Sequence, residues 1–356
     1  MTLKTIAEQA GVSTTTVHRV LKGKGDVSAD TVKLIKNIIK KSGTSKMKDR
    51  QAAGNHKSEE KLFKTKCIGL LLVGRPVELL KVPLFARLMT EIENVLTSRG
   101  LMMTVMHMPE ADKIHPMISG ERLDGTFVFG HVPSKLLQSK LRDIHTVGLM
   151  GSEHYLEGWA DRVTSDFSIR GQMAFKYLQE KGHRRVAFLN PIRQQPAYRQ
   201  VGFSFCLAAE QEGLQTTMLE TEYPHHAGIW KAFEGKPVIE ELVDKLLLIP
   251  LEQRPTGIHV VNDEICVSVY KSLRKRGIEP GKDIDVISCG NHEEFLSQMD
   301  SCPATMDLNV GEIARRAIDK LIFRIKNPES LLGVTVTVPP KLIPPGNYKL
   351  RIKNSA

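Results

Sequence analysis

The sequence predicts an α/β protein in which a small N-terminal helical module precedes a larger core of parallel sheets. Three observations support this fold class. Helical apolar spacing occupies the first residues and breaks at Gly11. Residues 1–66 hold 15 Lys or Arg and 6 Asp or Glu, a net +9 of the +10 on the whole chain. From Cys67 onward, short apolar runs alternate with helical segments, which is typical of parallel sheets.

The chain opens with two predicted helices joined at Gly11. Apolar residues before this glycine recur at helical spacing and predict one buried face, made of Leu3, Ile6, Ala7 and Ala10. Gly11 suits a helix end because glycine readily adopts the left-handed conformation. Ser13 is a suitable N-cap for a second helix, which runs to about Leu21 and buries Val17 and Val20. An ordinary helical hairpin shares this pattern, but the adjacent positive charge favours a module that binds phosphates.

A third predicted helix follows, with Ser28 as its N-cap and an inner face made of Val32, Ile35, Ile38 and Ile39. Three short helices that share one apolar face predict a compact headpiece. The lysines on the outside of the third helix are interpreted as a solvated face. The predicted organisation is a DNA-binding headpiece at 1–57, a linker at 58–66 and an effector-binding and dimerisation core at 67–356.

The core is predicted to contain short apolar strands at 67–73, 101–107, 122–129, 146–149, 162–165, 185–189, 257–261 and 285–289. Predicted helices between them lie at 84–98, 171–181, 202–212 and 264–276. These strands are too many for one compact sheet, so we expect two lobes with a cleft between them. Small ligands bind in such clefts, at the carboxyl ends of parallel strands.

Composition points to a soluble protein of the cytoplasm. Apolar residues make up 41% of the chain and charged residues 25%, as in ordinary globular proteins. The N-terminus lacks the apolar run of a signal peptide, and no stretch approaches the ~20 apolar residues of a membrane span. The 5 cysteines are scattered without a C-x-x-C pair, which argues against a disulfide framework or a structural zinc site. No cofactor and no metal are expected.

Taken together, these segments resemble the lactose-repressor (LacI/GalR) family of bacterial transcription regulators over nearly the whole chain. The resemblance is carried by residues 2–21, 83–85, 163–166, 182–188, 199–203, 261–264 and 303–307. It implies a two-lobed core like that of periplasmic sugar-binding proteins. It also implies a homodimer that reads near-palindromic operator DNA, and an expected association with the nucleoid.

The resemblance assigns residues to two sites. At the DNA it implies base contacts from Thr14, Thr15 and Arg19, phosphate contacts from Ser13, Thr16 and His18, and a further basic contact from Lys22. In the cleft, the positions that match effector contacts are Phe85, Asp166, Arg199, Tyr223, Asn262 and Gly290, with Asn291 beside them. For an isolated Asp or Arg the alternative is a surface ion pair, and for Phe85 and Tyr223 it is simple core packing.

Two departures from the family pattern bear on function. Gly290 stands where the family has a ligand-binding carboxylate. Either one contact is missing, or Asn291 or His292 supplies it, or the ligand differs. In the linker, Ala53 stands where the family's hinge helix has a leucine that wedges into the minor groove. Alanine is a poor wedge, so less bending of the operator is expected.

The predicted function is a sequence-specific DNA-binding transcriptional regulator, expected to be a repressor. A small effector, expected to be a sugar or sugar derivative, would bind between the lobes and change operator affinity. Three alternative functions are a solute-binding protein, an enzyme, and a regulator of the same fold that binds no ligand. The basic headpiece argues against the first. The sequence holds no metalloprotease, nucleophile-elbow or nucleotide-loop motif, which argues against the second.

Overall fold

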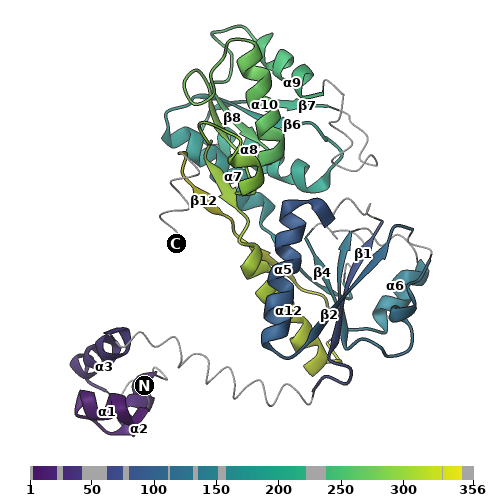
Figure 1. The fold of residues 1–356 in the computed structure, drawn as a ribbon. Coiled ribbons are helices and arrows are strands. Elements are labelled where there is room, and N and C mark those ends of the chain that lie inside the picture. Colours follow the sequence, from purple (N-terminus) through teal and green to yellow (C-terminus); the bar gives the residue numbers. More distant parts are fainter. Residues whose placement is uncertain are drawn as a thin grey trace. The chain divides into compact units, whose positions relative to one another are not determined.

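The computed structural model describes residues 3–21, 27–41, 62–74, 80–110, 113–130, 135–150, 158–221, 238–330 and 332–346. The chain forms two compact units, Met1–Lys64 and Thr65–Ala356 (Figure 1). The linker position Ala53, which bears on operator bending, lies outside the described residues. Within the described ranges no helix is long and apolar enough to cross a membrane.

The first unit is a three-helix headpiece, made of α1 (Leu3–Ala10), α2 (Thr14–Leu21) and α3 (Ala29–Lys41). Gly11 joins the first two helices at a φ of +63°, the left-handed conformation that its sequence position predicts. One side chain from each helix is completely buried where the three meet, and these are Ile6, Val17 and Ile35. The apolar face predicted from helical spacing is therefore the core of this unit.

The first lobe of the second unit is a six-stranded parallel sheet in the order β11-β5-β4-β3-β1-β2. The strands are β1 (Cys67–Val73), β2 (Met102–Met108), β3 (Gly125–Gly130), β4 (Thr146–Leu149), β5 (Asp161–Ser165) and β11 (Thr335–Val338). Helices α5 (Pro83–Ser98) and α12 (Val310–Lys326) lie side by side on one face (Figure 1). Helix α6 (Lys135–Arg142) packs on the other face through Leu137 and Leu141.

The second lobe is a four-stranded parallel sheet in the order β7-β6-β8-β9. Its strands are β6 (Arg185–Asn190), β7 (Gln215–Glu220), β8 (Gly257–Val260) and β9 (Asp285–Ile287). Its helices are α7 (Phe167–Glu180), α8 (Pro196–Gln211), α9 (Val238–Leu247) and α10 (Asp263–Lys275). Helices α7 and α8 approach closely at Gly171, where a β-carbon would collide with the backbone of α8.

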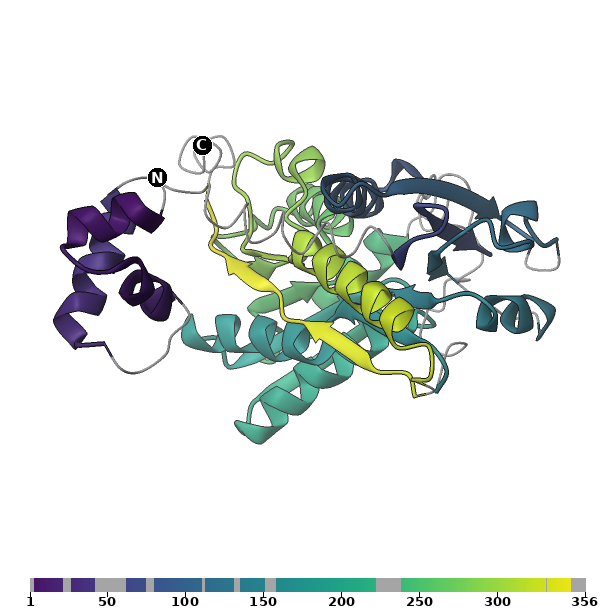
Figure 2. The same cartoon turned by 90° about the horizontal axis from the view of Figure 1, so that it is seen from below.

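The two lobes are joined by three passages of the chain, between β5 and α7, between β10 (Thr305–Asp307) and α12, and between β11 and β12 (Lys341–Ile343). Strands β10 and β12 pair antiparallel, and Ala304 just before β10 bridges to Ile287 of β9. Figure 2 shows β11 continuing toward β12 along the same side as α12. Two separate parallel sheets are the arrangement that the strand count predicts.

Candidate functional site

The exposed side of α2 is the first candidate site. Thr14, Thr15, His18 and Arg19 are exposed, while Val17 on the opposite side is buried. Ser13 caps the helix, because its Oγ accepts a hydrogen bond of 3.1 Å from the Thr16 amide. The same Oγ lies 2.9 Å from Oγ1 of Thr16, so these two hydroxyls already bond to each other.

The first turn of α2 contains no acidic residue, and Arg19 is the arginine of this helix. A helix N-terminus also presents unpaired amides that favour negative charge. Hydroxyls, amides and a guanidinium on one exposed helix face suit contacts with phosphates and base edges. Lys22, which the sequence assigned to the same surface, lies outside the described residues.

A cavity between the two lobes is the second candidate site. Its volume is about 170 Å³, below the ~300–1,000 Å³ of sites for drug-sized ligands. It therefore suits a molecule with one small ring. Aromatic rings form much of its wall, and they come from Phe85, Phe129, Phe167, Tyr198 and Phe295. Its other polar or titratable side chains are those of Arg170, Gln195, Asn262, Glu264, Cys289 and His292.

Asp263 holds the loop that closes one side of this cavity. Its carboxylate is completely buried. Oδ1 accepts hydrogen bonds from the hydroxyls of Ser288 and Thr305, the latter at 2.8 Å, and Oδ2 accepts one of 2.8 Å from the amide of His292. These bonds fix the loop from Ser288 to His292 against the start of α10, so the side chains on it have defined positions.

Gly290 and His292 share one corner of the cavity. Gly290 has a φ of +132°, and a β-carbon there would collide with the His292 ring and with Oδ2 of Asp263. The imidazole therefore occupies the space that a larger residue at 290 would take. Its Nε2 is buried, and no described residue hydrogen-bonds to it. Burial lowers the pKa of His292, although the Asp263 carboxylate opposes this effect.

Glu264 brings a carboxyl group to the same cavity from the first turn of α10. Its Oε2 is buried, and among the described residues it has no hydrogen-bond partner. Burial raises the pKa of this carboxyl to about 7. Next to it, Nδ2 of Asn262 donates a 3.2 Å hydrogen bond to the Tyr198 hydroxyl, and burial raises the pKa of that phenol.

Arg170 supplies the positive charge of the cavity wall. It is 5% exposed, and Nη2 donates a 3.3 Å hydrogen bond to the Val261 carbonyl. Its guanidinium carbon also lies 5.8 Å from the centre of the Phe167 ring. Nearby, burial raises the pKa of the Cys289 thiol to about 11, so that group is a neutral thiol at neutral pH.

Three of the seven predicted effector contacts, Phe85, Asn262 and Gly290, line the cavity. Asp166, Arg199 and Asn291 are not among the residues that line it, and Tyr223 lies outside the described residues. Asp166 is the N-cap of α7 and accepts a 2.9 Å bond from the Ile169 amide. Arg199 is exposed on α8.

Asn291, in contrast, takes part in a contact between the lobes. Its Nδ2 donates a 3.1 Å hydrogen bond to Oδ2 of Asp307. The same carboxylate oxygen lies 3.2 Å from Nη2 of Arg87, which is on α5 of the first lobe. Of the options that Gly290 leaves open, the geometry thus favours His292 as the group that faces the cavity.

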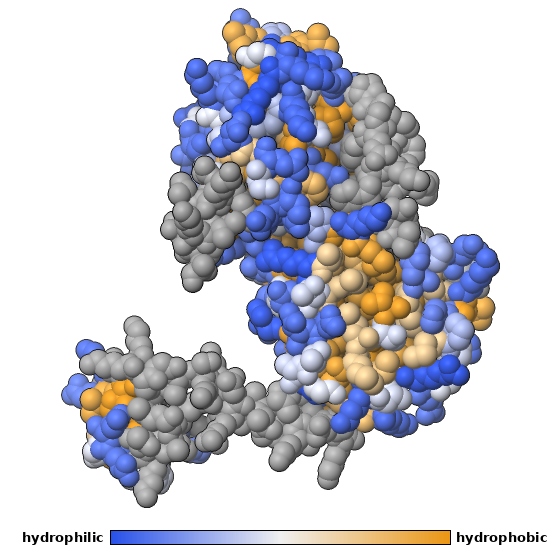
Figure 3. All heavy atoms as spheres, in the orientation of Figure 1, coloured by the Kyte–Doolittle hydropathy of each residue, from blue (hydrophilic) through white to orange (hydrophobic). Residues whose placement is uncertain are grey.

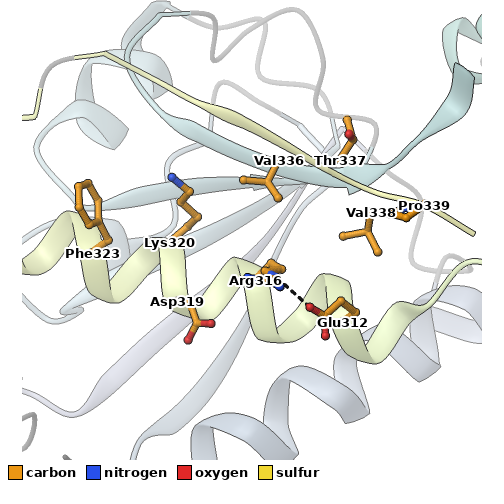
Figure 4. Close-up of a pocket in the computed structure, with 9 residues that line it drawn as sticks. All are labelled: Glu312, Arg316, Asp319, Lys320, Phe323, Val336, Thr337, Val338 and Pro339. Atoms are coloured by element: carbon orange, nitrogen blue, oxygen red, sulfur yellow. Dashed lines mark hydrogen bonds and ion pairs between the residues drawn. The ribbon is translucent and has the colours of Figure 1, made fainter. Parts of the chain in front are cut away.

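A second hollow runs along α12 and β11 and is larger, about 450 Å³ (Figure 4). Both acidic side chains of its lining are already paired, because Glu312 accepts a 2.8 Å bond from Arg316 and Asp319 accepts one of 2.8 Å from Arg99. Figure 4 shows Arg316 turned toward Glu312 along the helix. Groups that satisfy one another on an open surface offer a ligand little, so the cavity between the lobes is the stronger candidate.

Glu264, Arg170 and Tyr198 line the cavity, but the sequence alone predicts no role for them. A signal existed for Arg170, which lies one helical turn after Asp166 on α7 and so shares its side of the helix. Glu264 directly follows Asn262 and Asp263, but only the fold shows that its carboxylate enters an apolar cavity. In the described ranges, no group of three or more His, Cys, Asp or Glu could hold a metal ion.

Comparisons with known proteins match both parts of the chain. Residues 2–43 match the bacterial regulatory proteins of the lacI family, and residues 175–345 match a periplasmic binding protein-like domain. The ribose operon repressor of Escherichia coli K12 is 26% identical over 336 residues, covering 92% of this chain and 94% of the relative.

Two solved structures share the fold at low sequence identity. The transcriptional regulator CelR–cellobiose complex has a TM-score of 0.65 at 18% identity, covering 97% of this chain and 99% of that one. The lac repressor dimer bound to operator and the anti-inducer ONPF has a TM-score of 0.62 at 16% identity, with 97% and 98% coverage.

Proposed function

This chain belongs to the lacI family of bacterial regulatory proteins, and from that premise we propose that it is a sequence-specific DNA-binding transcriptional repressor. The observation that carries the proposal is the exposed face of α2, which presents Thr14, Thr15 and Arg19. A guanidinium can bond guanine bidentately, and a threonine methyl can contact thymine. Ser13, Thr16, His18 and Lys22 are proposed to contact phosphates.

We further propose that the cavity binds a small effector, a sugar or sugar derivative. A buried carboxylate oxygen and a buried imidazole nitrogen without partners among the described residues favour this over a regulator that binds no ligand. An effector that prefers one arrangement of the lobes changes operator affinity by the difference in its binding free energy between the two arrangements. In the present arrangement Arg87 and Asp307 form one contact between the lobes, at 3.2 Å.

A homodimer is part of the proposal. The outer strand β2 exposes Met102 and Val105, and Figure 3 shows apolar side chains on that face of the first lobe beside α5. An exposed apolar strand at a sheet edge favours pairing with another chain. The lac repressor, which shares the fold, is a dimer on its operator. Two headpieces would read a near-palindromic site in the nucleoid of the cytoplasm.

The proposal is tested by selection from random duplex DNA. The full-length protein is expected to enrich a near-palindromic sequence with two half-sites, because each headpiece reads one of them. If no sequence is enriched at any salt concentration that permits binding, the basic headpiece attracts DNA only non-specifically.

A further inference from the structure

We infer that the effector carries a positively charged amino group on a body the size of one sugar ring, and that Glu264 binds this group. This inference rests on the proposed effector site and specifies its ligand as an amino sugar. Three features of the cavity support it: an uncompensated carboxyl group, aromatic walls, and an uncharged imidazole.

Among the residues that the structure describes, none places a positive charge on the carboxyl group of Glu264. Among the described residues that line the cavity, Arg170 is the one Lys or Arg. Its Nη2 donates to the Val261 carbonyl and its guanidinium lies over the Phe167 ring, while its Nε has no partner among the described residues. No described residue donates a hydrogen bond to the buried Oε2 of Glu264. A buried carboxylate without a partner is unfavourable, so a ligand cation would supply what the protein does not.

The walls of the cavity favour the same kind of ligand. Phe85 and Phe129 meet edge to face, with ring centres 5.1 Å apart, and Tyr198 and Phe295 line the same cavity. Aromatic faces attract cations through their quadrupole and also stack on the apolar face of a sugar ring. Several aromatic rings together with one carboxylate form the combination that recognises an ammonium group in an otherwise apolar site.

His292 supplies a polar contact that does not oppose a cation. Its buried Nε2 has no partner among the described residues, and it lines the cavity with Glu264. Because burial lowers the pKa of this imidazole, the ring is neutral at neutral pH. A neutral ring can bond to a hydroxyl without repelling an amino group, and it occupies the corner where Gly290 leaves no side chain.

The experiment measures dissociation constants by calorimetry on the full-length protein at neutral pH. The probes are D-glucosamine, D-galactosamine and D-mannosamine, each compared with its parent hexose. At least one amino sugar is expected to bind about 10- to 100-fold more tightly than its parent, the range for a hydrogen-bonded charged group. Glu264→Gln, which is isosteric, should remove that preference. Glu252→Gln, a change at an exposed glutamate of the same lobe, should keep it.

Three results would overturn the inference: equal affinity for an amino sugar and its parent, a preference that survives Glu264→Gln, or no binding of any amino sugar. The comparison within the wild-type protein does not depend on the folding of a variant. DNA binding that requires Arg19, measured on the same preparation, separates these failures from a failure of the proposed function.

Discussion

The imidazole ring of His292 lies against Gly290, in the space that a β-carbon at position 290 would occupy. The two residues are therefore linked: the glycine is what admits the histidine to the cavity. A carboxylate at 290 and the present position of His292 exclude each other. The pair therefore places an imidazole at this corner of the cavity, while Glu264 brings a carboxyl group from the first turn of α10.

Gly290→Ala is predicted to lower the free energy of unfolding by about 2–5 kcal/mol, because the φ of +132° is strained for alanine and the new methyl group displaces His292. Gly346→Ala is the matched control, since its φ is +152° but nothing lies within 4 Å of the added carbon. Urea titration of both variants should show the larger loss of unfolding free energy for Gly290→Ala. Equal losses would show that His292 moves aside at no cost.

Glu264→Gln is predicted to stabilise the ligand-free protein at alkaline pH. The folded pKa of about 7 lies above the ordinary 4.5, so the unfolded chain releases this proton first, and stability falls as pH rises through that window. Above the window the variant should be more stable by on the order of 2 kcal/mol, discounted for partial exposure. Below about pH 4 the two proteins should not differ. Thermal melts at several pH values provide the measurement, and a gain that is independent of pH would refute the assignment.

Much of the fold follows from the sequence because its signals are local. Apolar runs predicted β1, β4 and β6 at nearly their observed bounds, and helical spacing predicted the headpiece core. Strand β7 was missed because Gln215–Glu220 is polar and alternating, as suits the edge of a sheet. Helix α12 was also missed, although its buried apolar residues recur at helical spacing from Val310 to Ile322 and so gave a local signal.

The effector site follows less well from the sequence. Asn262 and Asp166 were predicted to bind ligand, yet both act as helix N-caps, a role that the same residue types serve equally well. The way the two lobes pack decides whether a capping residue also faces the cavity. No local sequence pattern encodes this packing. Glu264 and His292 became visible as site residues only when the fold placed two unpartnered polar atoms in one apolar cavity.

His259 is predicted to make the second lobe sensitive to acid. It is completely buried between the rings of Phe188 and Phe205, and burial lowers its pKa to about 3. Below the ordinary value of 6.5 the unfolded chain takes up a proton that the folded lobe does not, so stability is lost as pH falls. The loss should reach about 2–3 kcal/mol near pH 4.5. In the His259→Gln variant this part of the pH dependence of stability should vanish. If urea titrations of the variant show the same slope of unfolding free energy against pH as the wild type, His259 is not the cause.

Val105→Lys is predicted to convert the proposed dimer to a monomer, because it places a charge on the exposed edge strand β2, where Val105 is 42% exposed. Leu248→Lys is the control, since Leu248 is 82% exposed on the second lobe, away from this strand. Sedimentation velocity should show a smaller species for the first variant alone. If the Val105→Lys protein sediments like the wild type, strand β2 does not form the dimer interface.

The most direct test of the central claim is the affinity of the full-length protein for its selected operator, measured by fluorescence anisotropy at moderate salt. Arg19→Ala should weaken specific binding by about 5- to 150-fold, the equivalent of ~1–3 kcal/mol for a guanidinium on a base edge. Lys33→Ala, a change at an exposed lysine of α3, should leave the preference for operator over scrambled DNA intact. An Arg19→Ala protein with undiminished preference for the operator would contradict the assignment of α2 as the helix that reads DNA.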